Sequence, residues 1–309
     1  MIRTLLWSVW AIIPVLALSY HFGPGQTHLA RDRAASLLAE ARQAEAEAER
    51  LHKLAFDAHL AVFEAQRRAF IDTRIKPEDI PEAARAAVER ERDAYERSAE
   101  AWATAAELYG EVASLLSGEG VHAASTDRGA IGETDRFDAI ALAEARALVG
   151  AGEVFNGVSR LEYVLDKRVA AGQAEGRAAG LTSSVREELA AAKYIGARLL
   201  REEGFPGDVW RGVATESRQH YTLLAQRELE IADGPEAQRL RLNVERVLDL
   251  EQSDRSQLDG MPLPRRSPRG RRPGDGDPRD GQGQAPTRRP SRGPPASGAS
   301  TSLPFGPGW

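Results

Sequence analysis

The chain has 309 residues and a formal net charge of −5, and 28% of its residues are charged. It contains no cysteine, which excludes disulfide bonds, cysteine-based zinc sites and thiol nucleophiles. Folding must therefore depend on packing alone.

An uncharged run of 17 residues, from Thr4 to Tyr20, opens the chain. At about 1.5 Å per residue it spans roughly 26 Å, slightly less than the ~30 Å hydrocarbon core of a bilayer. Trp7, Trp10 and Tyr20 stand where interfacial aromatic residues are expected, and Pro14 is tolerated in a membrane helix. Residues 1–22 are therefore predicted to form a single transmembrane anchor.

Two alternatives to the anchor are a cleaved secretory signal, with Ala17-Leu18-Ser19 as an acceptable small-residue site, and a buried soluble helix. Arg3 precedes the run, and the next basic residue is Arg31. Both leading interpretations place the body outside the cytoplasm, either as a single-pass membrane protein or as a secreted one. The predicted location is periplasmic or extracellular.

A heptad pattern of small and apolar residues predicts a long helix over about 27–73. Its members are Ala34, Leu37, Ala41, Ala44, Ala48, Leu51, Ala55, Ala58, Val62, Ala65 and Ala69. Pro77 and Pro81 interrupt the chain, and a second helix with the same spacing, broken only by Glu91, follows to about residue 117. The short connection favours an antiparallel hairpin over 27–117, although an intermolecular coiled coil would use the same residues. Tyr95, Trp102 and Tyr109 lie seven apart, which predicts packing against a third helix.

After a loop over about 117–133, shorter amphipathic helices are predicted in a domain spanning 134–254. Ser184 with Glu187 is typical of a capping box, Gly204 of a helix stop, and Gly234-Pro235 of a stop and restart. No alternating pattern of useful length predicts a strand. The predicted fold class is all-α.

Small and large packing residues across two of these helices resemble the tetratricopeptide repeat. The first unit has Ala141, Ala145, Leu148, Gly152, Gly157, Leu161, Val164 and Leu165, and a second has Tyr194, Ala197, Leu200, Gly204, Ser217, Tyr221 and Leu224. The chain departs from the family in an enlarged turn at 205–208 and in lacking the usual first aromatic residue and closing proline. The resemblance implies a protein-binding superhelix without catalysis.

Five residues are predicted to contact a partner. Phe205 and Trp210 bracket a Pro-Gly turn, where exposed aromatic residues can anchor a partner, although the two could instead fill the gap between helix ends. Tyr194, Arg198 and Arg160 are candidates for the groove of the repeat pair.

No pattern for catalysis or for binding a cofactor or metal is found. His52 and His59 are about two turns apart on one helix, too far to share one metal ion. Residues 129–132 lack the Lys-Ser or Lys-Thr of a phosphate-binding loop. The protein is therefore predicted not to be an enzyme and to have no cofactor.

The tail over 255–309 is predicted to be disordered, because Pro, Gly, Ser and Arg dominate it. From residue 261 on, nine arginines and three aspartates give +6, so the first 260 residues carry −11. The tail is either a polyanion-binding segment or a solubilising linker neutralised by the acidic body. The polyanion-binding candidates are Arg265, Arg266, Arg269, Arg271 and Arg272.

These features together predict a membrane-anchored, extracytoplasmic scaffold that mediates a protein–protein interaction. Its predicted partners are membrane lipid, through the N-terminal helix, and an unknown protein, with a homo-oligomer as a further possibility. Nucleic acid is not expected outside the cytoplasm. The alternatives are a protein that binds polyanions or the envelope surface through its arginine-rich tail and a purely structural coiled-coil oligomer.

Overall fold

A computed structural model describes Trp10, residues 12–15, Leu18, Tyr20, residues 24–71, 82–117, 127–173, 179–231 and 233–254, and Leu258. Within these residues the chain is helical and contains no strand, which confirms the predicted all-α class. The chain divides into two compact units, Met1–Val164 and Leu165–Trp309, and each is described separately.

Most of the predicted N-terminal anchor, including Trp7, lies outside the described residues. Trp10, Pro14 and Tyr20 are described, and all three are exposed. Among the described segments, no helix combines the length and the apolar character needed to cross a bilayer. The predicted transmembrane helix therefore has no support from this part of the chain. The arginine-rich tail is likewise outside the described residues, apart from Leu258.

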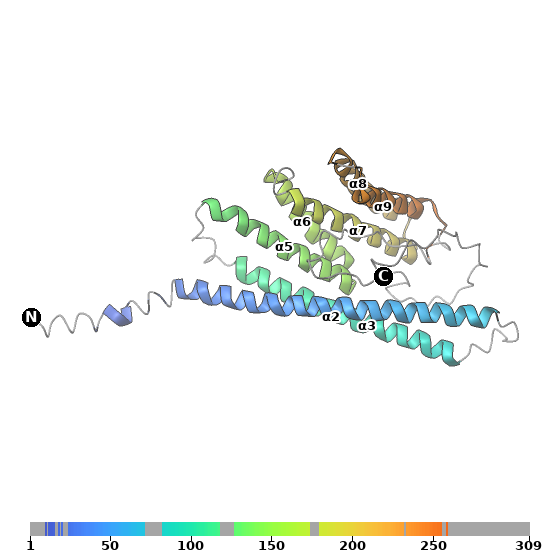
Figure 1. Ribbon diagram of the computed structural model, residues 1–309, viewed down its shortest axis with the longest axis horizontal. Coiled ribbons are helices and arrows are strands. Elements are labelled where there is room, and N and C mark those ends of the chain that lie inside the picture. The colour runs from blue at the N-terminus through green and yellow to red at the C-terminus, as the bar shows by residue number, and fades with distance from the viewer. Residues whose placement is uncertain are drawn as a thin grey trace, which may run out of the picture. The chain divides into compact units, whose positions relative to one another are not determined.

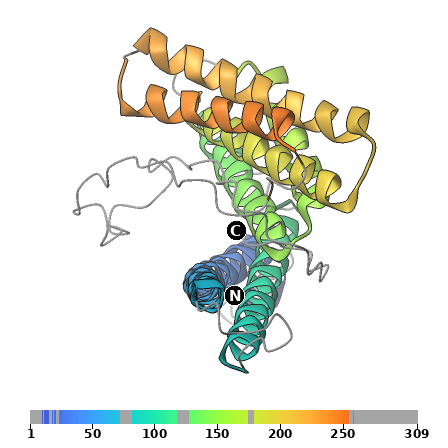
Figure 2. The ribbon, with the colours of Figure 1, turned by 90° about the vertical axis from the view of Figure 1, so that its right-hand side faces the viewer.

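The first unit is built on two long helices, α2 (Pro24–Ile71) and α3 (Glu82–Ser117), which lie side by side (Figures 1 and 2). An ion pair joins Arg33 to Glu111 at 2.8 Å, and His59 Nδ1 lies 2.8 Å from Glu91 Oε1, so residue numbers rise on α2 as they fall on α3. The pair is therefore an antiparallel hairpin within one chain. The deepest positions of α2 recur every seven residues, at Ala34, Ala41, Ala48, Ala55 and Val62. Alanine at this spacing allows the two backbones to approach closely.

The third helix of this unit, α5 (Asp127–Ala151), packs along the C-terminal half of α3. Gly150 of α5 faces the indole of Trp102, and a Cβ at this glycine would lie 2.6 Å from Trp102 Cδ2. Trp102 thus contacts a third helix, as the aromatic spacing predicted. Tyr109 of the same stripe is buried but donates its hydroxyl hydrogen bond to Glu45 of α2. The helix begins at Asp127, inside the predicted loop.

A tight turn at Gly152 connects α5 to α6 (Val154–Ala170). Gly152 has φ 97°, and the amides of Gly152 and Glu153 donate to Val149 O and Leu148 O, as in a Schellman motif. Gly157 then lies against the preceding helix, since an added Cβ would approach Ala145 O to 2.9 Å. The missing side chain is what lets the two helices touch here.

The second unit contains α7 (Ala179–Glu203), α8 (Gly207–Ile231) and α9 (Pro235–Gln252). The Ser217 hydroxyl of α8 donates to Ala190 O of α7 at 2.7 Å, and α8 also packs along α9 (Figure 2). Arg239 near the start of α9 pairs with Glu187 near the start of α7, and Arg201 near the end of α7 donates to Leu250 O near the end of α9. The helices therefore run up, down and up, with α9 parallel to α7.

Two of the predicted helix-end signals in this unit are confirmed and one is wrong. Gly204 has φ 87° and ends α7, while Gly234 is the N-cap of α9 and Pro235 its first residue. Ser184 is not an N-cap, because α7 begins five residues earlier. The Ser184 hydroxyl instead donates to Gly180 O at 3.0 Å. A serine inside a helix can make this bond to the preceding turn, so the capping motif was misleading.

Candidate interaction surfaces

The interface between α2 and α3 is interrupted by polar contacts at one level of the hairpin. His59 Nδ1 lies 2.8 Å from Glu91 Oε1, and both side chains are mostly buried. Two turns earlier on α2, the ring of His52 meets Tyr95 edge-on. Glu91, the single break in the heptad pattern of α3, is thus matched by a histidine of α2. A buried polar pair of this kind favours one register over others, at some cost in stability.

The pKa of the Tyr95 phenol is raised well above its ordinary value. Burial, together with the neighbouring Glu91 carboxylate, raises the pKa of Tyr95 to about 12. Both effects disfavour the phenolate, so the side chain is a neutral phenol at physiological pH.

Beyond Trp102 the hairpin continues as two helices, and we call residues 49–71 of α2 and 82–99 of α3 the arm. Trp102 is covered by Gly150 of α5, whose helix ends at Ala151. Further along the same side of α3, Tyr95 is half-buried and Val88 is exposed. In the described part of this unit, no third helix covers that side of the arm.

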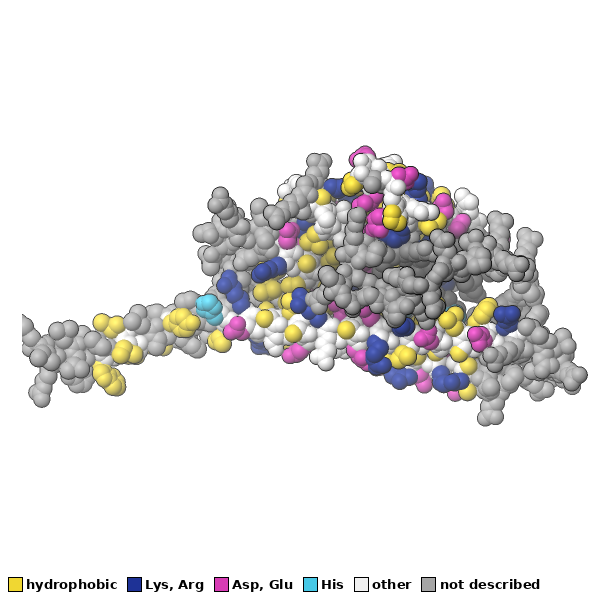
Figure 3. Space-filling model, viewed as in Figure 1, with side chains coloured by type: hydrophobic (Ala, Val, Ile, Leu, Met, Phe, Trp, Pro, Cys, Tyr) yellow, Lys and Arg dark blue, Asp and Glu magenta, His cyan; other side chains and the backbone are white. Residues whose placement is uncertain are grey.

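The bare side of the arm carries an apolar surface, which we call the arm face. Phe56, Leu60 and Phe63 are four and three residues apart on α2, so they form one stripe, and all three are exposed. Val88 and Tyr95 of α3 adjoin them, since His52 and His59 bring this side of α2 against Tyr95 and Glu91. Hydrophobic side chains also interrupt the charged surface along the hairpin in Figure 3. An exposed apolar stripe of this kind is typical of an interaction surface.

The five predicted partner residues are divided between the two units and differ in exposure. Tyr194 has 0% of its surface exposed, and Arg198 is buried and bonded to Glu202 at 2.7 Å. Arg160 belongs to the first unit, where it pairs with Glu144 at 2.9 Å. Of the five, only Phe205, at 46% exposed, presents a large apolar side chain to solvent.

Trp210 fills the gap between helix ends, which was the alternative interpretation of the Pro-Gly turn. Its ring is 5% exposed and lies between two guanidinium groups, with Arg201 at 4.5 Å and Arg211 at 4.8 Å from the ring centroid. Burial and the nearby Arg211 lower the pKa of Arg201. Arg201 also donates to the Leu250 and Ser253 carbonyls, so this cluster ties the α7–α8 turn to the end of α9.

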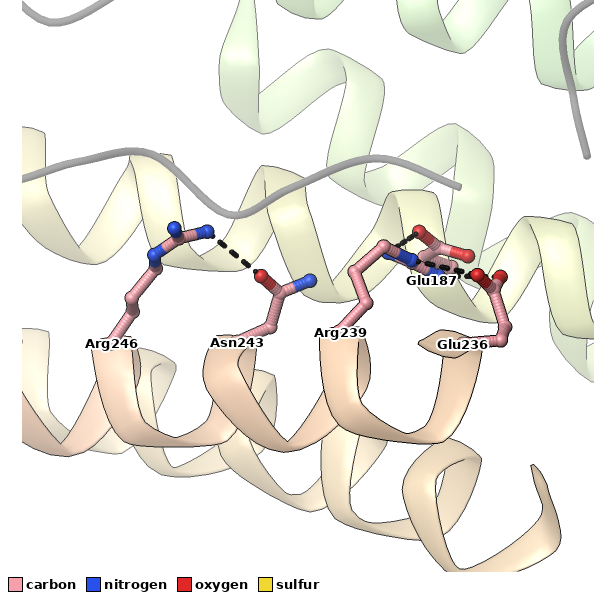
Figure 4. Close-up of polar contacts among 5 residues, drawn as sticks. All are labelled: Glu187, Glu236, Arg239, Asn243 and Arg246. Atoms are coloured by element: carbon pink, nitrogen blue, oxygen red, sulfur yellow. Dashed lines mark hydrogen bonds and ion pairs between the residues drawn. The ribbon is translucent and has the colours of Figure 1, made fainter. Parts of the chain in front are cut away.

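A row of polar side chains lines the contact between α9 and α7 (Figure 4). Arg239 donates to Glu187 of α7 at 2.7 Å and to Glu236 of its own helix at 2.9 Å. One turn further, Asn243 is fully buried and accepts a hydrogen bond from Arg246 at 3.1 Å. Burial alone would lower the pKa of Arg239, but its bonds to Glu236 and Glu187 outweigh this and raise the pKa. Arg239 thus has an acidic partner on each of the two helices, so its contacts are suited to fixing how α7 and α9 pair.

Sequence reasoning missed the arm face, although its signal is present in the sequence. The 56–60–63 spacing is a helical stripe, but it lies outside the heptad positions that predict the hairpin. The Arg239–Glu187 pair had no comparable signal, because the two residues meet only when α9 folds back beside α7.

In the described parts of the chain, no group of three or more His, Asp or Glu side chains is placed to hold a metal ion. The polyanion-binding candidates Arg265, Arg266, Arg269, Arg271 and Arg272 lie outside those parts.

Comparisons with protein-family models, with curated proteins and with solved structures found no match to this chain. The resemblance to the tetratricopeptide repeat therefore stays a prediction.

Proposed function

We propose that this protein is a membrane-tethered helical scaffold that binds another protein through the arm face. The observation that carries the proposal is the unequal covering of one side of the hairpin. Trp102 lies beneath α5, whereas Phe56, Leu60, Phe63 and Val88 on the arm are exposed. Leaving large apolar side chains in water has a cost, which a bound protein would offset.

The tether is proposed from the uncharged run over residues 4–20, which lies just before α2. The helix α2 has 48 residues, so at about 1.5 Å per residue it extends roughly 70 Å from its N-terminal end. A rigid rod of this length would hold the arm well away from the anchor. The charge distribution around the run favours an extracytoplasmic body, with secretion after signal cleavage as the other outcome.

The first test is the size of the complex that the full chain forms in detergent-solubilised membranes, measured by sedimentation. The wild-type chain is expected to sediment as a complex whose mass exceeds that of a single chain. The double variant Phe56→Asp/Phe63→Asp is expected to sediment as a single copy, because two carboxylates would have to be desolvated in the interface. Recovery of the intact chain from the soluble fraction would contradict the tether.

The matched control is the double variant Phe155→Asp/Tyr163→Asp, which places two carboxylates at exposed aromatic positions on α6. It is expected to leave the complex intact. Equal loss of the complex in both double variants would show that added charge, and not the arm face, is responsible.

A further inference from the structure

We propose that the protein bound by the arm face is a second copy of the same chain, with the two arms antiparallel. This inference rests on the proposed function, because it names the partner of the same surface. The heptad seam of α2 is already occupied by α3 within one chain. Self-association of the arm must therefore use another side of α2, and the arm face is an apolar side left bare.

The charges that flank the apolar stripe determine the orientation. Glu49 and Arg67 are 18 residues apart, which is five helical turns, so they lie on the same side of α2 at opposite ends of the stripe. Both side chains are exposed. Parallel arms would place like charges together, whereas antiparallel arms place Glu49 against the partner's Arg67 at both ends. In that register the two-fold axis passes near residue 58, and Phe56 meets the partner's Leu60.

The position of α5 favours the same orientation. Because α5 covers this side of the hairpin from Trp102 onward, a parallel second copy would collide with it along the base. Antiparallel arms overlap only over the bare stretch. The tip of each arm then reaches the end of the partner's α5.

The size of the surface indicates how strong the dimer is. The stretch from residue 49 to residue 67 is about 28 Å long, and two helices side by side are about 20 Å wide. Each copy therefore buries about 600 Å², and the pair about 1,200 Å², which is the lower end for a specific interface. A reversible, concentration-dependent dimer is expected.

The test is sedimentation equilibrium of the purified full chain in a non-ionic detergent, over concentrations of about 1–100 μM. The wild-type chain is expected to move from monomer to dimer within this range. Glu49→Arg brings two positive charges together at each end and is expected to weaken the dimer about tenfold. The double variant Glu49→Arg/Arg67→Glu restores opposite charges and is expected to recover the wild-type dissociation constant within about threefold.

The double charge swap distinguishes a second copy from a different protein, because only a symmetric contact is restored when one chain carries both changes. Unchanged helical circular dichroism in the variants verifies that they fold. A wild-type chain that stays monomeric, or a double swap that stays as weak as Glu49→Arg, would overturn the inference. If the purified chain is monomeric while Phe56→Asp/Phe63→Asp still disrupts the complex in membranes, the proposed function stands and the partner is a different protein.

Discussion

At the scale of single residues, Gly150 determines how closely α5 approaches the hairpin. Its missing side chain leaves room for the rigid indole of Trp102, and an added Cβ would come within 2.6 Å of that ring. Gly150→Ala is therefore expected to lower the free energy of unfolding by about 1–3 kcal/mol, despite the better helix propensity of alanine. Urea unfolding followed by circular dichroism measures the change.

Gly212→Ala is the matched control for this substitution. Gly212 also lies inside a helix, α8, but a Cβ there meets nothing within 4 Å. Alanine is expected to stabilise the chain at this position by up to about 1 kcal/mol. If the two alanine variants change stability in the same direction, steric contact with Trp102 does not explain the effect.

Single residues also show how far the sequence could be interpreted. The spacing of Tyr95, Trp102 and Tyr109 predicted contact with a third helix, and Trp102 makes that contact. The prediction was possible because large side chains next to the α2–α3 interface must either pack against another element or remain exposed to solvent. The roles of Tyr194 and Arg198 were not predictable in this way. Both sit on a helix whose covered side depends on where α8 and α9 fold, and both are buried.

At the scale of elements, the pairing of α7 with α9 depends on Arg239. Its guanidinium is the shared partner of the mostly buried carboxylates of Glu187 and Glu236. Arg239→Ala removes the guanidinium that both carboxylates share, and it is expected to lower the free energy of unfolding by about 2–3 kcal/mol. Urea unfolding of the full chain measures the loss.

A second arginine on the same helix provides the comparison. Arg241 pairs with Asp233 at 3.3 Å, and both side chains are largely exposed. Arg241→Ala is expected to change stability by less than about 0.5 kcal/mol, since solvent screens such pairs. An equal loss in the two variants would mean that burial of the Arg239 contacts contributes nothing.

The elements were predicted best where proline or glycine punctuates the chain. The helix α2 ends before Pro77 and α3 begins after Pro81, and Gly204 and Gly234 end or begin helices as expected. The starts of α5 and α7 were predicted too late. In α5 the first turns are rich in Gly and Thr, and in α7 a plausible cap at Ser184 lies inside the helix, so local propensity gave the wrong boundary.

At the scale of the whole molecule, the all-α class follows from helical periodicity and is confirmed for the described residues, whereas the interaction surface that we propose was not predicted. Periodicity identifies the side of a helix that must be buried, and the heptad stripe of α2, which is the strongest such pattern in the sequence, is buried against α3. The apolar stripe of the arm face is visible in the sequence, but whether it stays uncovered depends on where α5 packs along α3, which is a tertiary property. If the dimer forms with both chains anchored, their N-terminal ends lie about 100 Å apart, so a shared membrane requires the rod to lie along its surface.

The most direct test of the account is whether the arm face is covered in the native membrane. Because the chain has no cysteine, Phe63→Cys introduces a single thiol, and Tyr163→Cys provides a control at a position of similar exposure, 63% against 60%. The measured quantity is the rate of maleimide labelling of each variant in isolated membranes. The account predicts that Phe63→Cys reacts at least about tenfold more slowly than Tyr163→Cys, and that urea removes the difference. Equal rates in intact membranes would mean that nothing covers the arm, and would contradict it.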